Sequence, residues 1–78
     1  MVFQKVAGIL AEIIEVEDEA ITSETQLSTA IGVDALHVAK LVIECEKKFR
    51  ITIHDEDVHT FKYVKDMVEY IEKIQSDR

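Results

Sequence analysis

Apolar residues recur at intervals of three and four along three stretches of this 78-residue chain, and no proline interrupts them. This spacing lines up apolar side chains on one face of a helix. It predicts long helices over residues 2–15, 35–49 and 64–75. Residues 56–60 are predicted to form one short helix. We therefore expect an all-α bundle of three long helices and one short helix.

The segments between these helices carry fewer apolar residues. Residues 16–33 begin with an acidic, irregular stretch, and we expect a long loop held to the core by Ile21, Leu27 and Ile31. Loops of this length in compact domains are usually functional. Residues 51–53 alternate in polarity, but no partner strand is evident, so we interpret them as a tight connector.

Two aspartates stand where helices are predicted to begin. Asp34 precedes the second long helix, and Asp55 precedes the short one. A carboxylate at such a position can accept hydrogen bonds from the free amides of the first turn. Both aspartates are therefore expected to be N-caps.

Length and charge exclude several classes of protein. A chain this short has room for one core, so we interpret residues 1–78 as a single domain. The net charge of −7 disfavours binding to nucleic acid, because phosphates are bound by lysine and arginine. No apolar run reaches the length of about 18 residues that a membrane span needs. The start of the chain does not resemble a secretory signal, and we expect a cytoplasmic monomer.

The charge is distributed unevenly. Residues 1–34 hold seven acids and one base (−6), residues 35–50 two acids and four bases (+2), and residues 51–78 seven acids and four bases (−3), which sum to −7. A basic middle therefore lies between two acidic flanks.

Three features occur in one order along the chain. Residues 32–36 read Gly-Val-Asp-Ala-Leu, residues 41–49 run from Leu-Val-Ile to Glu-Lys-Lys-Phe, and residues 53–57 are rich in acids. Together with the long first loop, they resemble the acyl carrier proteins of fatty-acid or polyketide synthesis. In that family the second helix opens with Gly-x-Asp-Ser-Leu. The resemblance runs from the first helix to residues 70–71, and so covers nearly the whole chain.

The resemblance implies a cofactor and a set of partners. The family's serine carries 4′-phosphopantetheine, which a phosphopantetheinyl transferase installs from coenzyme A with magnesium, and its arm carries acyl thioesters among synthases and acyltransferases. This chain has Ala35 at that position, and alanine has no oxygen to phosphorylate. Asp34 and Leu36 match the residues beside the attachment point. Asp34 would help to position the transfer, and Leu36 would contact partners.

Two explanations of Ala35 remain open. Alanine could replace an original serine in this chain, or the protein could be a natural relative that lost the cofactor and kept the binding surface. In the second case it would act as a cofactor-free interaction module. A peptidyl carrier shares the same fold and serine position, although the net charge of −7 argues against it.

The predicted second helix supplies the candidate partner-binding residues. By resemblance, Leu36 and Ile43 would offer apolar contacts. Many members of that family carry acids along this helix, whereas this chain departs from them with His37, Lys40 and Lys47, which would tune which partners bind. The alternatives are that Leu36 and Ile43 are ordinary core and that the lysines form a solvated face, with Lys47 paired to a glutamate one turn away.

An acyl pocket is also implied by the resemblance. Its predicted lining is Leu27, Leu41, Val42, Cys45, Ile53, Val58, Phe61, Met67 and Ile71. Apolar residues at helical spacing are core residues first, so each could instead serve packing alone.

The remaining reactive side chains do not indicate catalysis. Cys45 lies mid-helix among apolar residues, where nothing would lower the pKa of its thiol, so we interpret it as buried and inert. Residues 54–59 contain acids and two histidines without a recognised zinc or calcium pattern, so no metal site is predicted. No nucleophile, base or phosphate loop forms a catalytic set. We expect a carrier and not an enzyme.

Overall fold

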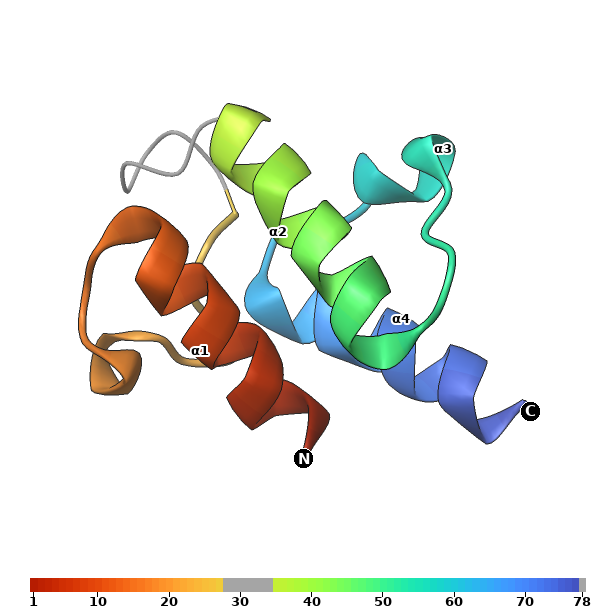
Figure 1. Cartoon of the computed structure of the whole chain (residues 1–78), viewed down its shortest axis with the longest axis horizontal. Helices are drawn as coiled ribbons and strands as arrows, with labels where there is room; N and C mark the ends of the chain where they lie inside the picture. The colour runs from red at the N-terminus through yellow and green to blue at the C-terminus, as the bar shows by residue number, and fades with distance from the viewer. Residues whose placement is uncertain (28–34, 78) are drawn as a thin grey trace.

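The computed structural model describes residues 1–27 and 35–77, and the regular elements in these residues are helices. In order, it contains α1 (Val2–Ile14), the 3-10 turn η1 (Asp18–Ala20), α2 (Ala35–Phe49), α3 (Asp55–Val58) and α4 (Val64–Ser76). α1 packs against both α2 and α4. The short α3 lies on the side of α2 that faces away from α1 (Figure 1). The predicted bundle of three long helices and one short helix is confirmed. None of the described helices is long and apolar enough to cross a membrane.

Each long helix buries one face in a common core. Leu10 of α1, Leu41 of α2 and Met67 of α4 are completely buried, as the spacing of the apolar residues predicts. Burying such a side chain stabilises the fold by about 2 to 3 kcal/mol. Because the helices meet through these residues, the opposite face of α2 is left toward solvent.

α1 and α2 end in the same way. Glu15 and Arg50, the residues that follow the helices, have φ angles of 59° and 56°. The next amides bond back into the helix, Val16 N to Ala11 O at 2.9 Å and Ile51 N to Glu46 O at 3.2 Å. This Schellman pattern satisfies carbonyls at the helix end and turns the chain sharply.

The connector after α2 is fixed by a glutamate side chain. Glu46 Oε2 accepts a hydrogen bond from Ile53 N at 2.8 Å. The short helix then begins at Asp55, one residue earlier than predicted, with His54 in the N-cap position and no side-chain cap. The prediction that Asp55 is an N-cap was therefore wrong, because the His54 carbonyl accepts hydrogen bonds from the amides of Asp57 and Val58, which places Asp55 inside the first turn. Asp34, the other predicted cap, lies outside the described residues.

The first loop is tied to the start of α4 by backbone bonds. Leu27 N donates to Lys62 O at 2.8 Å, and Val64 N donates to Thr25 O at 2.9 Å. Ile21 and Leu27 are buried, which confirms two of the three predicted anchors of this loop, while Ile31 lies outside the described residues.

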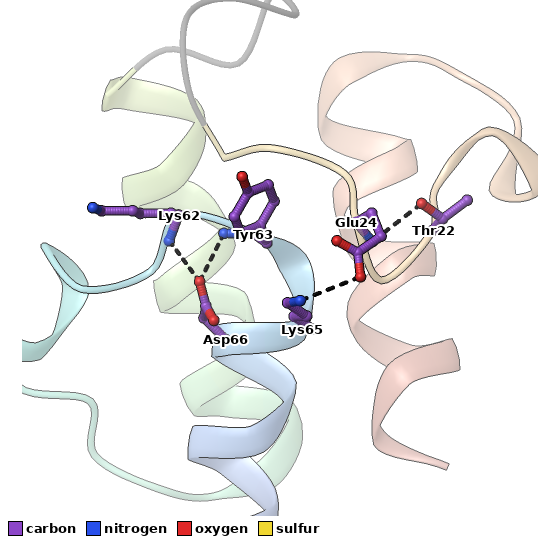
Figure 2. A network of polar contacts seen from close by, with 6 residues as sticks. All are labelled: Thr22, Glu24, Lys62, Tyr63, Lys65 and Asp66. Carbon is purple, nitrogen blue, oxygen red and sulfur yellow. Dashed lines mark hydrogen bonds and ion pairs between the residues drawn. The ribbon is translucent and has the colours of Figure 1, made fainter.

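Side chains strengthen this junction (Figure 2). Lys65 Nζ pairs with Glu24 Oε1 at 3.3 Å across the loop. Asp66 Oδ2 accepts hydrogen bonds from the amides of Lys62 and Tyr63, each at 3.0 Å, and so caps the first turn of α4. These contacts anchor residues 24–27 to the start of α4.

Gly8 gives a prediction about stability. It lies in the middle of α1, and the nearest heavy atom that an added Cβ would meet is Asp18 Oδ2, 4.0 Å away. Glycine is less favourable than alanine in a helix interior by about 1 kcal/mol. We expect Gly8→Ala to raise the free energy of unfolding by about that amount, measured by urea denaturation with far-UV circular dichroism. Gly8→Ser should give a smaller gain, and a lower midpoint for Gly8→Ala would contradict the expectation.

Candidate functional site

The solvent-facing side of α2 carries two large apolar residues. Leu36 is 63% exposed and Ile43 is 50% exposed. Lys40 and Lys47 are exposed on the same helix, and His37 is half-buried. At 3.6 residues per turn, residues 36, 40, 43 and 47 lie on one face. The structure thus brings four of the five predicted partner-binding residues onto one surface, and the alternative that Ile43 is core is excluded by its exposure.

The lysines of α2 are partly balanced by acids. Lys47 Nζ lies 3.8 Å from Glu44 Oε1, and both side chains are more than half exposed. Such a pair adds only a few tenths of a kcal/mol to helix stability. It limits the positive charge that Lys47 presents without removing it.

Residue 35 is the first residue of α2. The start of a helix suits a phosphate, because amide groups there lack partners within the helix. Attachment of 4′-phosphopantetheine, however, needs a hydroxyl oxygen, which alanine lacks. The residue present at this position therefore does not fit the covalent group that the resemblance implies. Asp34 lies outside the described residues.

A cavity of about 690 Å³ opens between α2, the connector and α3. Five of the residues predicted to line a pocket do so, namely Leu27, Val42, Ile53, Val58 and Phe61. Leu41, Cys45, Met67 and Ile71 do not line it and are completely buried in the core instead. The resemblance assigned these four to the pocket, and helical spacing could not tell the core side of a helix from the side that faces the cavity.

The cavity also has lining residues that the sequence did not suggest: Val38, Ala39, Ile43, Glu46, Asp55 and His59. Val38 and Ala39 lie one turn before Val42, so helical spacing from that residue could have found them. Glu46 could not have been found in this way. Its carboxylate faces the connector because it accepts the Ile53 amide, a tertiary contact.

α3 is held against α4 by a tyrosine. Tyr70 Oη donates a hydrogen bond to Asp57 Oδ2 at 2.7 Å. The Tyr70 ring also packs edge-to-face on Phe61, with ring centroids 5.2 Å apart. Burial and the bond to Asp57 raise the pKa of the Tyr70 hydroxyl, so it stays protonated and keeps donating at neutral pH. The side of the cavity formed by α3 is thereby fixed.

Cys45 behaves as the sequence predicts. Its side chain is completely buried. Burial, together with the nearby charge of Glu44, raises the pKa of its thiol to about 12. The thiol is therefore protonated at neutral pH and is a poor nucleophile. In residues 1–27 and 35–77, no group of three or more histidines, cysteines or acids is arranged to hold a metal ion.

Comparisons with known proteins agree with this geometry. The family described as "Phosphopantetheine attachment site" matches residues 4–71. The acyl carrier protein of Aster yellows witches'-broom phytoplasma is 37% identical over 73 residues, which cover 94% of this chain and 96% of that protein. The acyl carrier protein of Thermotoga maritima is 35% identical over 72 residues, or 92% and 89% of the two chains.

A solved structure shows the same fold. The acyl carrier protein from Enterococcus faecalis superposes with a TM-score of 0.73 and is 31% identical, with 90% of this chain and 89% of that chain covered. Sequence family, relatives and fold agree over nearly the full length. The chain belongs to the acyl carrier protein family.

Proposed function

We propose that this chain is an acyl carrier protein with an intact docking face on α2 and a blocked attachment position at residue 35. Proteins of this family are carriers and not enzymes, the family carries 4′-phosphopantetheine, and its members interact with acyl-processing enzymes. The observation that supports the docking face is the exposure of Leu36 and Ile43, at 63% and 50%, on the helix that begins at residue 35.

Packing within the bundle does not explain why these two apolar side chains are exposed to solvent. The core of the bundle is filled by other residues of α2, including Leu41 and Cys45, which are completely buried. Single exposed apolar residues are ordinary, but Leu36 and Ile43 lie on one face, about 10 Å apart along the helix axis. An apolar surface of this kind supports docking of a protein partner.

A serine-bearing form would complete the site. Its hydroxyl would take 4′-phosphopantetheine from coenzyme A through a phosphopantetheinyl transferase, and the form would then shuttle acyl thioesters among synthases and acyltransferases. Leu27, Val42, Ile53 and Phe61 would line the pocket for the acyl chain, since all four line the cavity beside α3. We expect this form to be a cytoplasmic monomer.

Restoring the hydroxyl tests the proposal. The Ala35→Ser variant, incubated with coenzyme A, magnesium and a broad-specificity phosphopantetheinyl transferase, should gain the mass of one 4′-phosphopantetheine group by intact-mass spectrometry. The Ala35 chain is the matched control and should gain nothing, because it offers no oxygen at that position.

The opposite result would favour a second function. If several transferases leave folded Ala35→Ser unmodified, the recognition surface has diverged, and the chain is better described as a cofactor-free interaction module. The observation that favours this alternative is Ala35 itself. Modification of Ala35→Ser by transferases dedicated to peptide synthesis alone would indicate a peptidyl carrier.

A further inference from the structure

The exposed face of α2 alternates in character along one line. Leu36, Lys40, Ile43 and Lys47, which we call the α2 stripe, are spaced by four, three and four residues. At 1.5 Å per residue the stripe is about 17 Å long. Two apolar side chains alternate with two ammonium groups, and all four residues are exposed.

The stripe is a ridge between two grooves. Ile43 lines the cavity toward α3, and it also lines a second groove of about 570 Å³ toward α1. That second groove is lined by Ile9, Glu12, Ile13, Lys40, Ile43 and Glu44, so two carboxylates stand beside the stripe on this side. A partner that covers the stripe would therefore seat Ile43 in a recess and could reach into the groove on either side.

The charge of the stripe is opposite to that of the chain. The protein carries −7 overall, yet the only ionisable residues of the stripe are Lys40 and Lys47. Lys47 remains 72% exposed despite its pairing with Glu44. A basic partner surface would set like charges against Lys40 and Lys47, whereas carboxylates would pair with them.

We propose that the α2 stripe docks on a protein partner whose contact surface is acidic, with carboxylates facing Lys40 and Lys47 and apolar recesses for Leu36 and Ile43. This rests on the proposed role of α2 as the docking face and names the class of partner that this face selects. Because the remainder of the chain is acidic, such a partner is recognised by local pairing and not by long-range attraction.

Two synthetic helical peptides test the pairing. Both carry leucines at positions i, i+4 and i+7, and they differ only in having glutamate or lysine beside those leucines. Titrated into the ¹⁵N-labelled chain, the acidic peptide should shift the amide signals of residues 36–47. The basic peptide should instead shift signals of the acidic segments, such as residues 15–19.

Matched charge variants locate the effect. Lys40→Gln/Lys47→Gln should weaken the acidic peptide about tenfold, because two interfacial ion pairs are lost. Lys62→Gln/Lys73→Gln changes the net charge equally, at exposed lysines outside α2, and should leave its affinity unchanged. Circular dichroism would confirm that both double variants are folded.

Three results would overturn the proposal. The basic peptide could bind residues 36–47 more tightly than the acidic one, or the acidic peptide could leave these signals unshifted at the highest soluble concentration. The third is that analytical ultracentrifugation detects a dimer of this chain and finds only monomer for the Lys40→Gln/Lys47→Gln variant. A second copy of the chain would then supply the carboxylates that pair with the two lysines. None of these results affects modification of Ala35→Ser, so failure of this inference is distinguishable from failure of the proposed function.

Discussion

Replacing Leu10 by alanine is expected to lower the free energy of unfolding by about 3 kcal/mol. The Leu10 side chain is completely buried on α1, the helix that packs against both α2 and α4. Its truncation removes buried apolar surface and leaves a cavity that the surrounding helices cannot fill. Small domains are stable by only about 5 to 15 kcal/mol, so the loss is a large fraction of the total.

Urea denaturation followed by far-UV circular dichroism measures this change. Leu36→Ala is the matched control, since it removes the same atoms from a side chain that is 63% exposed, and it should change stability by no more than about 0.5 kcal/mol.

The rate of Cys45 alkylation gives a second readout of the same change in stability. The Cys45 thiol is buried and protonated in the folded chain, so alkylation at neutral pH should accelerate in Leu10→Ala. Equal stability of the two variants would contradict the assignment of the core.

The long helices could be predicted from sequence because local spacing determines them. The pattern along α1, α2 and α4 places the apolar residues on one face, and the predicted bounds agree with the structure to within a residue or so. The exposure of Leu36 was expected from the family resemblance and not from the spacing, which left a core position open. For Ile43 the spacing was ambiguous, since the residue adjoins the buried Val42, and only the packing of α2 settled its exposure.

The cavity was harder to predict because its boundaries depend on tertiary contacts. Leu41 and Val42 are neighbours with similar side chains, yet Val42 lines the cavity and Leu41 belongs to the core. The bond between Tyr70 and Asp57 joins residues 13 positions apart and fixes α3, which leaves no local signal in the sequence. The position of Glu46 beside the Ile53 amide could not be predicted either, because this contact also leaves no local signal in the sequence.

The unmodified chain is expected to inhibit its own serine variant. The proposed docking by Leu36 and Ile43 would not need the hydroxyl at residue 35, so the Ala35 chain should bind a phosphopantetheinyl transferase about as tightly as Ala35→Ser does. A competitor that binds and cannot react occupies the enzyme without turnover. Leu36→Asp in the competitor places a charge in the apolar contact and should raise the inhibition constant by about tenfold or more.

The decisive measurement is therefore the rate at which a transferase modifies Ala35→Ser in the presence of increasing Ala35 chain. A docking face that acts independently of the attachment oxygen predicts competitive inhibition, with an inhibition constant within about threefold of the KM for Ala35→Ser, since the two differ by one oxygen atom. The same inhibition by the Leu36→Asp competitor, or no inhibition by the Ala35 chain in large excess, would contradict a docking face on α2.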